Sequence, residues 1–294
     1  MWAFKKQNSQ WFGMIDGGDW EYIGTETRYP KADPVNLGLY QPPANLGSLM
    51  YTASEWTSAV GHWANVIVPT ATAESECRFD RINTYDNVNF TFGFLQLAAH
   101  TAGDNLALLI RKFLADAKLA AWFPDLVMSK GKIHQKLPNG TLADLETPPS
   151  GTWKSKKLMT YLNADTKVID EAEKTNALKF MHLARTSAKA RQLQVEASVD
   201  ACRTKLGYWP DALQSRVPDT VLSLVVSHLH WRGGTDKKKL FDLQLKPKPE
   251  QAILDFIKGL DKNRASSLES GLKAAKKAGW LGTKTYVKAT KKFE

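Results

Sequence analysis

Apolar residues that recur every three or four positions dominate the chain from residue 104 onward, and this period is typical of amphipathic helices. After Asp104 it places Leu106, Ile110 and Phe113 on one helical face. The same period predicts helices over residues 153–170, 171–206, 219–231, 249–260 and 263–278. We therefore expect a mostly α (α+β) protein whose strands are few and short.

The first part of the chain has a different character. It is rich in glycine, proline, tryptophan and tyrosine, as in the stretches Trp11-Phe12-Gly13 and Gly17-Gly18-Asp19-Trp20. Such sequences favour turns and short extended pieces, which predicts a loop-rich N-terminal layer. One helix is expected directly after it, because Ser54 can cap the helical spacing that runs toward Glu74.

These patterns suggest one compact unit with three parts. We expect a loop-rich layer over residues 1–50, a catalytic domain over 51–235, and basic C-terminal helices over 236–294 packed on the same unit. The weakest candidate for a domain boundary lies at residues 129–152, where Asn139-Gly140 predicts a turn or small hairpin that is followed by a loop.

Charge and cysteine content narrow the function classes. The 40 Lys and Arg residues exceed the 30 Asp and Glu residues, which gives a formal charge of +10 and predicts a basic surface. Cys77 and Cys202 are too few for a four-cysteine zinc cluster, so one disulfide or two buried thiols remain open. No run approaches the ~20 apolar residues of a membrane span, and no secretory signal is recognisable, so we expect synthesis in the cytoplasm.

Residues 74–101 contain the chain's main concentration of residue types that occur in active sites. Acids, amides and aromatics are concentrated there between two expected helices, with Glu74 at the end of the first helix. The polar residues that follow, among them Asn83 and Asp86, suit a small sheet or a looped tongue beside a cleft. This arrangement offers two carboxylates in different environments, as acid and base chemistry requires.

The order of residues in this segment resembles a known family. Glu74-Ser75, a polar tongue and then Phe92-Gly93-Phe94-Leu95-Gln96 look like the Glu-Ser … Gly-Leu-Met-Gln signature of goose-type lysozymes and soluble lytic transglycosylases. Gly93 follows Glu74 by 19 positions, as in the goose-type group. The resemblance covers residues 55–125 well and 210–234 weakly, where His228 and Trp231 lie on an apolar helix.

Two positions depart from the family pattern. Asn87 stands where goose-type enzymes often carry the aspartate that positions water, and Asp86 precedes it by one residue. Ala98 stands where the family has a second aspartate, two residues after the glutamine. These departures leave the second carboxylate of the reaction open.

The resemblance implies a lysozyme-like fold and cleavage of the β-1,4 bond between N-acetylmuramic acid and N-acetylglucosamine in bacterial peptidoglycan. Glu74 would then be the general acid and Asp86 the carboxylate that activates water. Six further residues would bind the glycan, and no metal or other cofactor would be needed. These six are Tyr85, Phe92, Gly93, Gln96, His228 and Trp231.

Other interpretations stay open at this point. The same scaffold can act as a lytic transglycosylase, or as a chitinase or chitosanase, and the basic charge also fits a non-enzymatic nucleic-acid-binding module. Glu74 can equally be an acid paired with Arg78 or Arg81, and Gln96 can simply bind a backbone group.

The resemblance also suggests a biological setting. A basic cell-wall hydrolase without a signal peptide suits a phage lysin or a toxin delivered by a type VI secretion apparatus, acting in the periplasm or cell wall of a target bacterium. An immunity protein would then be a second partner besides peptidoglycan, and nucleic acid would not be one.

Overall fold

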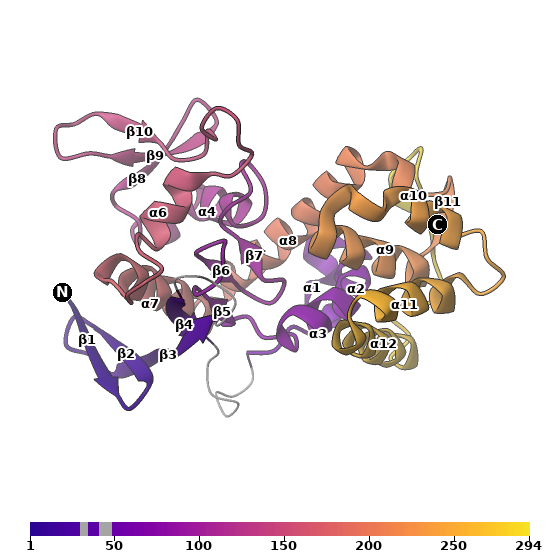
Figure 1. Ribbon diagram of the computed structural model, residues 1–294, viewed down its shortest axis with the longest axis horizontal. Helices are drawn as coiled ribbons and strands as arrows, with labels where there is room; N and C mark the ends of the chain where they lie inside the picture. The colour runs from indigo at the N-terminus through magenta and orange to yellow at the C-terminus, as the bar shows by residue number, and fades with distance from the viewer. Residues whose placement is uncertain (30–34, 41–48) are drawn as a thin grey trace. The chain divides into compact units, whose positions relative to one another are not determined.

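The computed structural model describes residues 1–29, 35–40 and 49–294 (Figure 1). About 48% of the chain is helix and 20% is strand, so the fold is mixed α+β. The chain forms two compact units, unit 1 with residues 1–50 and 78–197, and unit 2 with residues 51–77 and 198–294. This division differs from the expected parts 1–50, 51–235 and 236–294, because each unit combines segments from distant parts of the sequence.

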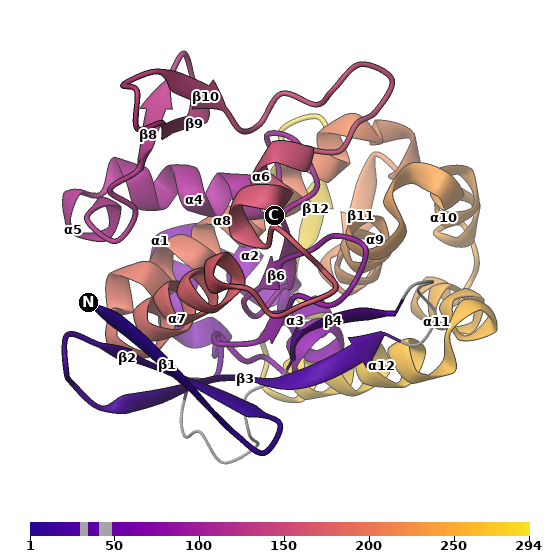
Figure 2. The same ribbon diagram turned by 60° about the vertical axis from the view of Figure 1, so that its left-hand side comes forward.

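Unit 1 begins with four antiparallel strands, which Figure 2 shows at the N-terminal end of the ribbon. The strands are β1 (Trp2–Gln7), β2 (Gln10–Ile15), β3 (Trp20–Tyr29) and β4 (Asn36–Tyr40). The loop-rich layer expected over residues 1–50 is thus largely a sheet in its described part. Aromatic and β-branched residues favour strands, and Asn8 and Gly17, with φ values of +56° and +77°, lie in the turns that join β1 to β2 and β2 to β3.

The sheet continues into residues 74–101, the segment that contains the candidate catalytic residues. Strands β5 (Ile82–Asn83), β6 (Thr91–Phe92) and β7 (Leu97–Ala98) extend it, and the strand order runs from β1 to β7 without a crossover. The Tyr40–Asn83 pair joins β4 to β5. The polar tongue predicted after Glu74 therefore contains a small three-stranded part of this sheet.

The helices of unit 1 cover an aromatic core. They are α4 (Leu106–Ala115), α5 (Ala117–Ala120), α6 (Lys156–Leu162), α7 (Glu171–Thr186) and the first half of α8 (Ala188–Tyr208). Phe180 of α7 lies at the centre, with its ring 5.1 Å from that of Phe92 and 5.5 Å from that of Phe123. The helix predicted over residues 153–170 is shorter than expected, since only α6 is helical there.

A second sheet of unit 1 contains β8 (Leu126–Ser129), β9 (Lys132–Lys136) and β10 (Leu142–Asp144) in antiparallel order. Asn139-Gly140 lies in the turn between β9 and β10, and Gly140 has a φ of +81°, which glycine adopts without strain. The predicted hairpin is confirmed.

Unit 2 is mainly helical. Its helices are α1 (Ala53–Val60), α2 (Trp63–Val66), α3 (Val68–Ser75), α9 (Asp219–Arg232), α10 (Lys237–Leu243), α11 (Pro249–Leu260) and α12 (Lys262–Lys277). A small sheet adds β11 (Arg216–Pro218), β12 (Thr285–Val287) and β13 (Lys292–Phe293). The helices predicted over residues 219–231, 249–260 and 263–278 are confirmed, whereas the single helix expected before Glu74 is broken into three.

Both cysteines are free thiols, so the open question of a Cys77–Cys202 disulfide is answered. Within the described residues, no helix is long and apolar enough to cross a membrane.

A buried glutamate joins three segments of unit 1. The Glu173 side chain of α7 accepts a hydrogen bond from the Leu39 amide of β4 at 2.9 Å and another from the Thr84 hydroxyl directly after β5. Its second oxygen, Oε2, has no hydrogen-bond partner among the described residues. Burial raises the pKa of Glu173 to about 8, although the bonds from Thr84 and Leu39 oppose that rise.

We expect the free energy of unfolding to fall as the pH rises from about 4.5 to about 8. The folded state keeps a proton on Glu173 that the unfolded chain releases, so raising the pH favours unfolding. Glu173→Gln copies the protonated acid and should lose this part of the pH dependence in thermal melts at pH 5 and pH 8. Glu171→Gln, an exposed position on the same helix, should keep the wild-type dependence, and equal profiles for both variants would contradict the assignment.

Candidate active site

Helix α3 ends immediately after Glu74 and Ser75. Glu76 and Cys77 adopt left-handed backbone angles, with φ values of +56° and +65°. Their amides donate hydrogen bonds to the carbonyls of Thr72 at 3.2 Å and Ala71 at 3.0 Å, which closes the helix. Glu74 therefore lies in the last turn of the helix, as the sequence predicts.

Helix α12 packs closely on α3 and brings an arginine to this acid. Gly271 allows the approach, because a Cβ atom there would lie 2.9 Å from the Pro69 backbone and 2.7 Å from the Thr72 hydroxyl. Arg264, two turns earlier on α12, consequently lies beside Glu74. A residue 190 positions away in the sequence thus becomes the nearest charged partner of the candidate acid.

The Glu74–Arg264 pair is a short, half-buried ion pair. Arg264 Nη2 donates to Glu74 Oε1 at 2.6 Å, and only 9% of the Arg264 and 16% of the Glu74 side chain is exposed. Arg264 Nη2 also lies 3.5 Å from the Ser227 hydroxyl, while its Nε is buried without a partner among the described residues. The alternative pairing of Glu74 with Arg78 or Arg81 is not found among the described contacts.

His228 and Trp231 of α9 lie next to this pair within unit 2. The Trp231 ring is half-buried, with the guanidinium of Arg264 4.8 Å and that of Arg232 5.4 Å from its centroid. His228 is fully buried, and its Nε2 lies 2.8 Å from Asp236. Burial lowers the pKa of His228, while Asp236 opposes this effect. The Trp231 ring is therefore partly exposed with two guanidinium groups against it, whereas the His228 ring is enclosed.

Asp86 lies in the loop between β5 and β6 of unit 1. Its carboxylate accepts hydrogen bonds from the Asn83 side chain and from the Val88 amide, both at 3.0 Å. Burial raises the pKa of Asp86 above the usual aspartate range, although these two bonds oppose the rise. The loop is also held by Asn89, whose amide donates to the Asn163 carbonyl at 3.1 Å. Asp86 is thus a fixed carboxyl group in a partly desolvated loop.

Tyr85 belongs to a cluster of half-buried aromatic rings. Its ring lies 5.7 Å from Tyr29 of β3 and 5.4 Å from Tyr40 of β4. The Arg81 guanidinium lies 5.3 Å from the centroid of the Tyr40 ring. Aromatic faces of this kind can stack on sugar rings, which is the role that the resemblance implies for Tyr85.

The remaining predicted binding residues, Phe92, Gly93 and Gln96, pack or form hydrogen bonds inside unit 1. Phe92 is fully buried against Phe180, so its ring is not available to a glycan. Gly93 has a φ of +86°, and a Cβ atom there would collide with the Gln194 side chain. Gln96 donates to the Gly93 carbonyl at 2.9 Å and to the Arg81 carbonyl at 3.2 Å. Packing and backbone hydrogen bonds account for the positions of these three residues, and their role in sugar binding stays a prediction.

The predicted site residues therefore fall into two groups. Glu74, His228 and Trp231 belong to unit 2, and Tyr85, Asp86, Phe92, Gly93 and Gln96 belong to unit 1. Sequence reasoning missed Arg264, Tyr29 and Tyr40. Their positions depend on helix packing and strand register, and no local pattern marks them. Among the described residues, no group of three or more His, Cys, Asp and Glu side chains is arranged to hold a metal ion.

Comparison with known proteins adds no relative to this description. No protein-family model, no curated protein and no solved structure matches the chain.

We expect Arg264→Met to lower the free energy of unfolding by about 2 kcal/mol, a value between those of buried and surface ion pairs. The loss follows because Glu74 is left half-buried without its partner. Arg216→Met is the matched control, since its pair with Glu294 is exposed by 58% and 55% and should contribute less than about 1 kcal/mol. Urea unfolding measures both, and equal losses would show that the Glu74–Arg264 pair does not stabilise the packing of α12 on α3.

Proposed function

We propose that the protein cleaves the glycan strand of bacterial peptidoglycan at the β-1,4 bond after N-acetylmuramic acid, with Glu74 as the general acid. The observation that carries this proposal is the order of elements around Glu74. A carboxyl group ends α3, and the chain then enters the short antiparallel strands β5, β6 and β7. An acid at a helix end followed by a small sheet is the order that the resemblance to goose-type lysozymes implies.

The surroundings of Glu74 support part of this role. The side chain is 16% exposed, so it can be reached by a ligand and is also shielded from bulk water. Partial desolvation strengthens electrostatic interactions with the charge that develops on the sugar in the transition state. Trp231, beside Arg264, offers an aromatic face in the same unit.

The ion pair with Arg264 sets a condition on this chemistry. A general acid has to reach the glycosidic oxygen with its own proton, and Glu74 Oε1 is already occupied by Arg264 Nη2 at 2.6 Å. The acid role therefore requires that the Arg264 hydrogen bond to Glu74 Oε1 opens when the glycan binds. The opened arginine would then be free to bind a carboxylate of the wall polymer.

Glycan binding has its own support in unit 1. The rings of Tyr29, Tyr40 and Tyr85 form a half-buried aromatic surface. A formal charge of +10 favours association with a polymer that carries carboxylates on its lactyl and peptide groups. The same charge would favour nucleic acid, but the described residues add no feature that is specific to that partner.

The biological setting follows as a second part of the proposal. We infer that the protein acts on the wall of a target bacterium, as a phage lysin or as a toxin delivered by a secretion apparatus. A toxin of this kind needs an immunity protein in the producing cell, and a protein that protects against cell lysis on co-expression would identify it.

We expect Glu74→Gln to reduce release of muropeptides from purified peptidoglycan by about 10² or more, because glutamine keeps the shape of the side chain but donates no acidic proton. Mass spectrometry of the soluble products measures the loss. Glu76→Gln is the matched control, since Glu76 is exposed and lies just past the helix end, and it should keep wild-type activity.

The products also identify the reaction. Fragments with a reducing muramic acid indicate a hydrolase, and fragments lighter by one water indicate a lytic transglycosylase. Release from chitin oligomers instead of peptidoglycan would indicate a chitinase. An inactive wild type, or a fully active Glu74→Gln variant, would overturn the proposed function.

Asp86 decides between the first two outcomes. If Asp86 activates water it has to be ionised, and its raised pKa moves the acidic limb of the pH–activity profile above the usual aspartate range. Asp86→Asn should then abolish hydrolysis at every pH. A variant that keeps wild-type activity and the same acidic limb would exclude Asp86 from the chemistry and favour the transglycosylase reaction, which needs no second carboxylate.

A further inference from the structure

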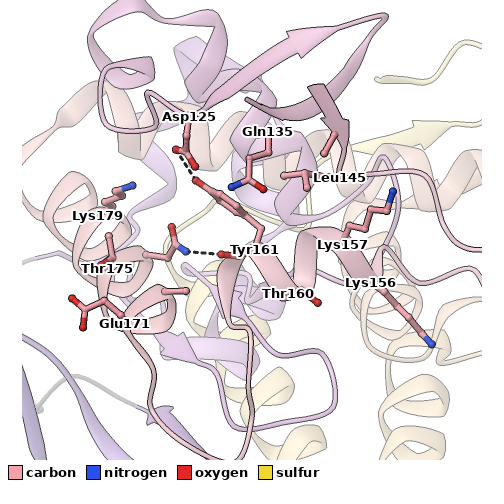
Figure 3. A pocket seen from close by; sticks show the side chains of 13 residues that line it. Asp125, Gln135, Leu145, Lys156, Lys157, Thr160, Tyr161, Glu171, Thr175 and Lys179 are labelled. Carbon is pink, nitrogen blue, oxygen red and sulfur yellow. Dashed lines mark hydrogen bonds between the residues drawn. The ribbon is translucent and has the colours of Figure 1, made fainter. Parts of the chain in front are cut away.

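A pocket of about 660 Å³ lies in unit 1 between α6, α7 and the sheet of β8, β9 and β10 (Figure 3). None of its lining residues belongs to the candidate active site. Lysine, amide, hydroxyl and carboxyl groups line it together with apolar side chains. The pocket is therefore a separate place at which a small polar ligand can bind.

Lys179 of α7 lines one side of this pocket. Only 7% of the residue is exposed, and its ammonium lies 5.3 Å from the centroid of the Phe123 ring and 5.8 Å from that of Trp2. Among the described residues, no acceptor bonds to Lys179 Nζ and no carboxylate lies within ion-pair distance. The ammonium opens to the pocket without a protein acceptor, and the aromatic faces around it replace only part of its hydration, so it is available to an acceptor in the pocket.

The nearest acid is already engaged elsewhere. Asp125 accepts a hydrogen bond from the Tyr161 hydroxyl at 3.1 Å, which Figure 3 shows as a dashed line. Burial lowers the pKa of Lys179, and the negative charge of Asp125 opposes this effect without a direct hydrogen bond. Lys179 thus keeps unused hydrogen-bonding capacity on the side that faces the pocket.

Further polar groups surround the opening. Lys156 and Lys157 of α6 line the pocket on the side opposite Lys179, and neither forms an ion pair among the described residues. Gln135, Thr160 and Thr175 add an amide and two hydroxyl groups. The other lining acid, Glu171, is paired with Lys174 at 2.9 Å. Positive charge therefore exceeds negative charge around this space.

We propose that this pocket binds a small ligand through a carboxylate group that pairs with Lys179. A carboxylate supplies the single negative charge and the acceptor atoms that the buried ammonium lacks. Asp125 disfavours a dianion such as phosphate, because its own negative charge lies close to the same space. The amide and hydroxyl groups of the lining suit the amide and hydroxyl groups of a short peptide or a sugar acid.

Titration calorimetry at pH 7 tests this with two carboxylate probes, N-acetyl-alanyl-alanine as the peptide and N-acetylmuramic acid as the sugar acid. We expect at least one to bind to the wild-type chain and identify the source of the carboxylate. Lys179→Met should weaken that binding by about tenfold or more. Methionine suits the position because Phe123 and Trp2 provide an apolar environment.

Two controls separate binding from folding. Lys189→Met removes an exposed lysine of the same unit outside the pocket and should leave affinity unchanged. The C-terminal amide of the peptide probe lacks the carboxylate, and a tenfold weaker affinity of the wild type for it supports the proposal without any mutation.

Several results would overturn the assignment. They are the absence of binding by both carboxylates, equal affinity for the acid and the amide form of the peptide, and inorganic phosphate binding more tightly than either probe. Unchanged affinity in a folded Lys179→Met variant would also overturn it. None of these outcomes depends on Glu74 or on cleavage of peptidoglycan, so this inference and the proposed function fail independently.

Discussion

The carboxyl group of Glu173 is the constraint on which much of unit 1 depends. It binds the Leu39 amide of β4 and the Thr84 hydroxyl at the end of β5, so one side chain of α7 fixes the place where the N-terminal strands meet the tongue. Gly38 makes the junction possible, because a Cβ atom there would lie 2.6 Å from the Tyr85 amide. Tyr85 and Asp86 follow Thr84 directly, so their positions depend on a buried acid that takes no part in the proposed chemistry.

The parts of the fold that the sequence predicts are those governed by local period and turn chemistry. Helix α11 begins at Pro249 and ends at Leu260, as its apolar spacing predicts. Helix α9 is also correctly predicted, although nearly all of it is buried, since the predicted segment over residues 219–231 is longer than a typical strand of about 4–8 residues. Asn139-Gly140 gives the expected turn because only a few residues adopt its backbone angles readily.

The parts that the sequence does not predict depend on partners far along the chain. The aromatic and glycine-rich start of the chain is equally compatible with loops and with strands, and the ladders between β1, β2, β3 and β4 make it a sheet, which the Tyr40–Asn83 pair joins to β5. The division into two units has the same origin, because residues 51–77 pack with residues after 198. Arg264 reaches Glu74 only because Gly271 lets α12 approach α3 closely.

Some of the residues whose order resembles goose-type lysozymes are explained by folding alone, and others are not. Gly93 is required by the Gln194 side chain, and Gln96 satisfies the carbonyls of Gly93 and Arg81, so both would be needed in a protein of this fold without any activity. Glu74 is different, because a half-buried carboxylate that needs an arginine to neutralise it adds little stability over an apolar pair. The proposed function therefore depends on Glu74 and on whether its hydrogen bond to Arg264 opens. Gly93 and Gln96 are explained by the folding of the segment that contains β5, β6 and β7.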